Sequence, residues 1–102
     1  MPGVGKLLKQ AQKMQKAMEA VQNELANLEV EGSAAGGAVK AVVSGQGALK
    51  SIKLDPEFLK EDVYSVEASI VAAVQDAAEK AKQKSEEEMN KVTGGFSIPG
   101  LL

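Results

Sequence analysis

Four lysines near the amino terminus are the side chains with the clearest chemical meaning. They recur at intervals of three, four and three residues: Lys6, Lys9, Lys13 and Lys16. This spacing aligns them along one side of a helix, and residues 1–18 contain no acidic side chain. Lysine ammonium groups neutralise phosphates as point charges. The pattern favours contact with a polyanion, and the competing interpretation is a helix face that is merely solvated.

An apolar seam runs along another side of the same predicted helix. Its residues alternate at spacings of three and four, as in a coiled coil: Val4, Leu7, Ala11, Met14, Met18, Val21, Leu25 and Leu28. A helix over residues 5–27 would be on the order of 35 Å long. A chain of 102 residues is too small to bury the apolar stripes of such long helices. We therefore expect a second copy of the chain to cover part of this surface.

The composition excludes several classes of chemistry. All twelve basic residues are lysines, and the chain has neither histidine nor cysteine. Disulfides, thiolate metal sites and the commonest general base are therefore missing. Without arginine, the commonest specific contact to guanine in the major groove is missing as well. We predict a protein that is not an enzyme and has no cofactor, metal site or small-molecule substrate. Its formal net charge is −2, so the protein is acidic overall.

Two glycine motifs and one acidic run offer weaker signals. Gly32 and Gly37 have the spacing of a phosphate-binding loop, but alanine and valine follow where lysine and serine or threonine are needed. Gly45 and Gly47 fit a tight hairpin turn between strands. Residues 86–88 are three glutamates whose side chains diverge around a helix, so they cannot converge on one cation. No apolar run has the length of a membrane span and no signal peptide is evident, so we predict a cytoplasmic protein without a membrane partner.

The order of patterns predicts an α+β fold: a helix, three antiparallel strands and a second helix in one domain over residues 1–102. Periodicity and glycine turns place the helices at 5–27 and 62–92, the strands at 28–34, 38–44 and 48–54, and a flexible tail at 93–102. Asp62 is expected to cap the second helix, and the pair Gly94–Gly95 to end it.

The second helix has an apolar stripe that thins to alanine at Ala73, Ala77 and Ala81. Such small side chains allow another helix to approach closely. On its polar surface, two favourable pairs have opposite charges four residues apart: Asp76–Lys80 and Glu87–Lys91.

Several segments together resemble the YbaB/EbfC family of small bacterial nucleoid-associated proteins. They are residues 36–40 (GGAVK), 44–47 (SGQG) and 50–57 (KSIKLDPE), with 7–15 (LLKQAQKMQ), 70–77 (IVAAVQDA) and 93–95 (TGG) around them. The resemblance covers roughly residues 5–95. It implies a homodimer whose sheets meet at the centre and whose helices project like tweezers to hold double-stranded DNA.

The resemblance supplies no short signature for the DNA contacts, so charge places them. The four amino-terminal lysines come first, followed by Lys84 and Lys91. The predicted dimer interface comprises Leu7, Met14, Met18, Val21, Val42, Ile52 and Ile70. Together these features predict a nucleoid protein that clamps the DNA backbone and organises the nucleoid or modulates transcription. The alternative is a chaperone-like adaptor that uses its helical arms to bind proteins, without direct contact to DNA.

Overall fold

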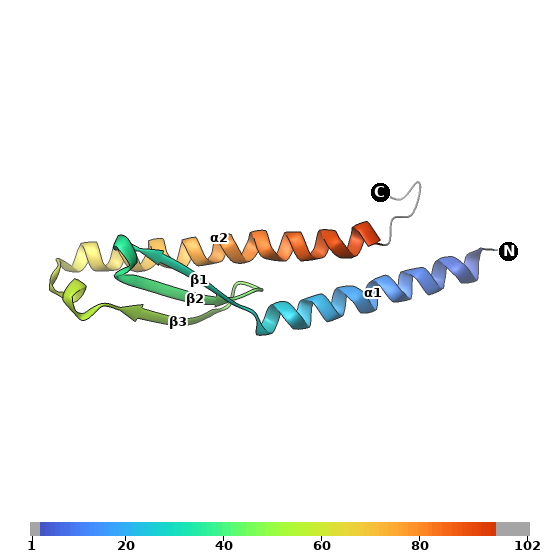
Figure 1. Cartoon of the computed structure of the whole chain (residues 1–102), viewed down its shortest axis with the longest axis horizontal. Helices are drawn as coiled ribbons and strands as arrows, with labels where there is room; N and C mark the ends of the chain where they lie inside the picture. The colour runs from blue at the N-terminus through green and yellow to red at the C-terminus, as the bar shows by residue number, and fades with distance from the viewer. Residues whose placement is uncertain (1–2, 96–102) are drawn as a thin grey trace.

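The computed structural model describes residues 3–95 and has the predicted order of elements (Figure 1). The elements are α1 (Val4–Asn27), β1 (Glu29–Ala34), the 3₁₀-helix η1 (Ala35–Gly37), β2 (Val39–Ser44), β3 (Leu49–Leu54), the 3₁₀-helix η2 (Pro56–Lys60) and α2 (Val63–Gly95). The α+β fold with a three-stranded antiparallel sheet is therefore confirmed. The molecule is elongated, with extents of 71 × 22 × 16 Å, because α1 and the carboxy-terminal half of α2 extend beyond the same end of the sheet.

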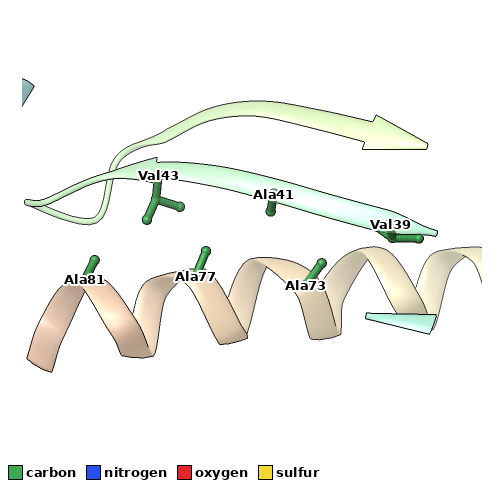
Figure 2. Close-up of a cluster of buried hydrophobic side chains, with 6 residues drawn as sticks. All are labelled: Val39, Ala41, Val43, Ala73, Ala77 and Ala81. Atoms are coloured by element: carbon green, nitrogen blue, oxygen red, sulfur yellow. The ribbon is translucent and has the colours of Figure 1, made fainter. Parts of the chain in front are cut away.

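The sheet has the strand order β1-β2-β3, and both pairs are antiparallel. Side chains alternate between the faces of a strand, so Val39, Ala41 and Val43 of β2 point toward α2 and are buried. Figure 2 shows them opposite the alanines at 73, 77 and 81 of α2. The core is thus a thin layer of small aliphatic groups between one sheet face and one helix.

The sequence indicates that the alanine stripe allows another helix to approach closely. The stripe packs instead on β1 and β2. Gly32 of β1 lies opposite Ala41 in the sheet, and a Cβ atom at Gly32 would come within 2.6 Å of the Ala73 carbonyl oxygen. Glycine and alanine therefore meet where strand and helix backbones approach most closely.

Asp62 caps α2, as predicted. Its carboxylate accepts a hydrogen bond of 3.0 Å from the Ser65 backbone amide and one of 2.6 Å from the Ser65 hydroxyl. The predicted end of the helix at residue 92 was wrong, because α2 continues through Thr93 and Gly94 to Gly95. The Thr93 hydroxyl donates back to the Met89 and Asn90 carbonyl oxygens within the helix. A glycine costs a helix only about 1 kcal/mol relative to alanine, and the rest of the predicted tail lies outside the described residues.

Candidate nucleic-acid interface

Helix α1 forms an arm that leaves the sheet and has little contact with the core. Alanine, glutamine, lysine, leucine and methionine dominate it, and these are strong helix formers. Leu25, near the sheet, is its one buried residue. The amino-terminal half of α1 is therefore a solvated rod (Figure 1).

The four lysines of this arm are exposed, and none of them forms an ion pair with another described residue. They are Lys6, Lys9, Lys13 and Lys16, which we call the arm lysines. Within residues 3–95, the ion pairs involve Lys60, Lys80, Lys84 and Lys91 instead. The first turn of α1 contains no acidic residue. The arm therefore presents a row of uncompensated positive charge to solvent.

The two second-choice candidates for DNA contact, Lys84 and Lys91, have their positive charges neutralised by one carboxylate. The Nζ atoms of Lys84 and Lys91 both lie 3.1 Å from Oε1 of Glu88. Hydrogen bonds from Lys91 and Lys84 lower the pKa of Glu88, and the hydrogen bond with Glu88 raises the pKa of Lys84. The predicted pairing of Lys91 with Glu87 was therefore wrong, since Glu88 is its partner. Lys84 and Lys91 are weaker candidates for phosphate contact than the arm lysines.

The apolar seam of α1 divides into two parts. Val4 is 47% exposed and Leu7 50% exposed. Met14, Met18 and Val21 are half-buried. Nearer the sheet, the side-chain amide of Gln22 donates to the Met89 sulfur of α2 at 3.7 Å. Part of the seam is thus shielded within the chain, and its outer end is left open.

The remaining residues of the predicted dimer interface lie in two different settings. Ile52 and Ile70 are half-buried and pack against the core of their own chain. Val42 lies on the opposite, open face of the sheet, and its strand neighbours in register are Glu31 and Ser51. The fold therefore does not gather these residues with the α1 seam into one surface of a single chain.

Asp76 of α2 joins the helix to the edge of the sheet. Its Oδ2 atom accepts a hydrogen bond of 3.0 Å from the Ser33 amide and lies 3.1 Å from Nζ of Lys80. The Ser33 hydrogen bond first, and the Lys80 hydrogen bond second, lower the pKa of Asp76. The pairing with Lys80 was predicted. The contact with Ser33 was not, because no local pattern links residues 43 positions apart.

Other kinds of site find no support in the described part of the chain. No group of three or more metal-ligating side chains gathers in residues 3–95, and no described helix is long and apolar enough to cross a membrane. A hollow of about 400 Å³ separates α2 from the residue 45–47 turn. The turn amides of Gln46, Gly47 and Ala48 already donate to Ser44, so this turn does not offer them to an anion.

Comparison with known proteins identifies the family to which this chain belongs. Residues 1–96 match the sequence model of the YbaB/EbfC DNA-binding family. The chain belongs to this family. The family description names DNA binding and not catalysis, in agreement with the predicted absence of enzymatic activity.

Relatives in this family are similar over nearly their whole length. A nucleoid-associated protein of Caldanaerobacter subterraneus subsp. tengcongensis is 44% identical over 100 residues, which cover 97% of this chain and 90% of the relative. A nucleoid-associated protein of Pelotomaculum thermopropionicum is 46% identical over 100 residues, covering 97% and 95%. Another, of Alkaliphilus metalliredigens, is 46% identical over 102 residues, covering 99% and 90%.

A solved structure has the same fold. The crystal structure of an uncharacterized protein from Helicobacter pylori superposes with a TM-score of 0.74 and covers 89% of this chain and 94% of its own. The two sequences are 19% identical. This similarity supports the α-β-β-β-α architecture of the YbaB/EbfC chain and nothing finer.

Proposed function

We propose that this YbaB/EbfC chain binds double-stranded DNA as a homodimer by placing its arm lysines against the phosphate backbone. The observation that carries the proposal is the row of four exposed lysines without ion-pair partners on α1, in a family described as DNA-binding. The relatives are named nucleoid-associated proteins. We place this chain in the nucleoid as well, where it organises DNA or modulates transcription.

The length of the lysine row suits contact with one DNA strand. Lys6 and Lys16 are ten residues apart, which is about 15 Å along a helix. Phosphates of one strand of B-DNA recur about every 3.4 Å along the axis, so the row is about as long as four such steps, and because the strand winds around the axis a straight helix meets only some of these phosphates. Because lysine contacts position a protein on the backbone and read no base, we expect weak discrimination between sequences and strong dependence on salt.

The proposed dimer covers apolar side chains that are exposed on β3 and on the adjoining flank of α2, a surface that we call the trough. Helix α2 packs mainly on β1 and β2, so the inner face of β3 remains partly open. Leu49 is 54% exposed there, and Ile52 is half-buried. Exposed apolar groups of this extent are typical of an interface between protein chains. A second copy of the chain is the partner that we assign to the trough.

The flank of α2 forms the other wall of this trough. Ala78 and Ser85 line the hollow beside the 45–47 turn, next to the start of β3. Tyr64 and Val71 precede Ala78 by fourteen and seven residues, so they lie on nearly the same helix face. Tyr64 is 79% exposed and Val71 55% exposed.

The predicted interface residues differ in how well they suit this proposal. The trough retains Ile52 and adds residues that the sequence had not indicated. Leu7, Met14, Met18 and Val21 belong to a second contact between arms, whereas Val42 contributes little because it faces away from α2 among polar groups. Ile70 supports the trough from the core side.

The experiment compares two variants of equal charge. In the first, the arm lysines are changed to glutamine; in the second, four lysines elsewhere are changed to glutamine: Lys40, Lys53, Lys60 and Lys80. Both variants have a formal net charge of −6, since each loses four positive charges from −2. Fluorescence anisotropy with a labelled duplex at low salt is expected to show a large loss of affinity for the first variant only. Equal losses, or retained affinity in the first variant, would contradict the proposal.

A second candidate function rests on the exposed tip of α1. Val4, Leu7 and Leu8 are 47%, 50% and 60% exposed, which also suits an adaptor that binds apolar segments of other proteins. Apolar binding persists as salt rises, whereas phosphate binding weakens steeply. Serine at Leu8, which is 60% exposed and lies outside the predicted dimer interface, would weaken binding of an unfolded client protein by such an adaptor and leave the affinity of the protein for DNA nearly unchanged.

A further inference from the structure

The turn between β2 and β3, residues 44–48, holds the sheet end of α1. The Gly45 amide donates to the carbonyl oxygen of Leu25 at 2.8 Å and to that of Leu28 at 3.0 Å. The Gln46 side-chain amide donates at 3.1 Å to both the backbone oxygen and the side-chain oxygen of Gln22. The Leu25 carbonyl lies in the last turn of α1, where carbonyl groups lack i+4 partners, and it accepts from the Leu28 amide at 3.2 Å as well as from Gly45. The β2–β3 turn therefore adds donors that tie the end of α1 to the sheet and restrain the direction in which it leaves.

Gly45 fits so closely against α1 that no side chain can be added. A Cβ atom there would lie 2.7 Å from the Leu25 carbonyl oxygen and 2.9 Å from Leu25 Cδ2. The φ angle of Gly45 is not in the left-handed region, unlike that of Gly47 at +91°. The turn conformation therefore requires glycine at Gly47, whereas the proximity of α1 requires it at Gly45.

The arm lysines lie far from this point of attachment. Lys16 and Lys6 precede Leu25 by nine and nineteen residues, or about 14 and 29 Å of helix. Leu25 is the one buried residue of α1, and contacts of α1 with α2, such as that of Gln22 with Met89, are the other restraint on the arm. A rotation of about 10° at Leu25 would move Lys6 by about 5 Å, which is more than the rise between successive phosphates of one strand.

We propose that Gly45 and Gln46 are positioning residues that set the direction of α1 and thereby align the arm lysines with DNA phosphates. This inference rests on the proposed function, because it assigns the direction of the arm to DNA binding. The two residues touch no DNA themselves. They act through Gln22 and Leu25, which they hold at the base of the arm.

The first test measures the direction of the arm without DNA. The chain has no cysteine, so spin labels can be attached to cysteines introduced at the exposed positions Gln12 of α1 and Gln83 of α2. Labelled protein diluted with unlabelled protein reports the distance within one chain. Gly45→Ala is expected to shift or broaden the distance distribution, and Gln46→Glu, which removes the donor, to broaden it. Gly36→Ala is the matched control, because it strains the η1 turn at the other end of the sheet and meets no atom within 4 Å.

The second test measures how the affinity for a labelled duplex depends on salt. Loss of two phosphate contacts per dimer lowers the log–log slope by about 1.8, and we expect at least this change for Gly45→Ala. A merely less stable protein would reduce the amount of binder and leave the slope unchanged. Unaltered distances and slope in both Gly45→Ala and Gln46→Glu, or equal changes in Gly36→Ala, would overturn the positioning role. Failure of the unaltered protein to bind DNA would instead overturn the proposed function.

Discussion

At the scale of single residues, glycine and alanine determine how closely α2 approaches the sheet. A Cβ atom at Gly32 would collide with backbone atoms of Ala73 and Ala77, and backbone atoms cannot move aside as a flexible side chain can. Val39, Ala41 and Val43 then fill the narrow space that remains (Figure 2). The core tolerates small side chains only, because the distance between helix and strand is set by backbone contact.

Gly32→Ala is therefore expected to lower the free energy of unfolding by about 3 kcal/mol or more, at the upper end of the cost of overpacking. Urea denaturation followed by circular dichroism measures this change. The control is Gly94→Ala, at a helical position with no atom within 4 Å, which should raise the free energy of unfolding by up to about 1 kcal/mol. Similar stabilities of the two variants would refute the close-contact explanation.

Asp76 is the residue whose charge links α2 to β1. Its pKa is lowered from the ordinary 3.8 by hydrogen bonds from Ser33 and Lys80. A carboxylate with a lowered pKa stabilises the folded state above its unfolded pKa, and this contribution is lost as pH falls through the folded pKa. The melting temperature of Asp76→Asn should therefore be below that of the unaltered protein near pH 7, and the difference should shrink as pH falls below about 4 and disappear only below the lowered pKa of the folded state. Glu79→Gln, an exposed substitution one turn later, should leave the melting temperature unchanged both near pH 7 and at low pH. A melting temperature of Asp76→Asn that is lowered equally at every pH would contradict the role of its charge.

At the scale of elements, the sequence predicted what local patterns encode. Alternation of apolar residues and the glycine turns identified the strands, and Asp62 marked the start of α2. Gly94 and Gly95 misled the prediction of its end, because glycine weakens a helix without stopping it. Two contacts join segments that are distant in the sequence: the packing of the alanine stripe on the sheet, and the hydrogen bond of Gln46 with Gln22. Pattern reasoning has no access to such contacts, and it placed candidate DNA contacts by charge alone.

The α1 arm should be the least protected helix. Its N-cap, Gly3, offers no side-chain hydrogen bond. Three pairs of lysines repel each other along the helix, and each pair lowers the stability of the helix by about 0.2–0.5 kcal/mol: Lys6–Lys9, Lys9–Lys13 and Lys13–Lys16. Hydrogen exchange should be faster for amides 7–16 than for amides 73–81. Binding of a DNA duplex should slow exchange in the arm about threefold or more by neutralising this repulsion. Slowing in residues 73–81 with none in the arm would contradict contact through α1.

At the scale of the whole molecule, the shape leaves much surface uncovered. The radius of gyration is 19.7 Å, against about 13 Å for a compact chain of 100 residues. Long arms and an open trough beside β3 give a single chain few contacts per residue. The elongated shape itself therefore favours assembly.

We expect sedimentation equilibrium to give a mass of about 21 kDa, twice the 10.6 kDa of one chain. Val71→Glu should shift the equilibrium toward 10.6 kDa, because it places a charge in the proposed interface. Ala72→Glu adds the same charge at an exposed neighbour about 100° around the helix, and should leave the dimer intact. A monomeric unaltered protein, or equal dissociation of both variants, would contradict the assignment of the trough.

The most direct measurement is the slope of log Kd against log salt concentration for a labelled duplex, with and without the arm lysines. A dimer brings eight arm lysines, so the binding constant of the unaltered protein should fall with a slope whose magnitude is several units and at most about 7. The variant with glutamine at all four arm positions should lose most of this slope. A slope that stays the same after the four substitutions would show that the DNA contacts lie elsewhere on the molecule.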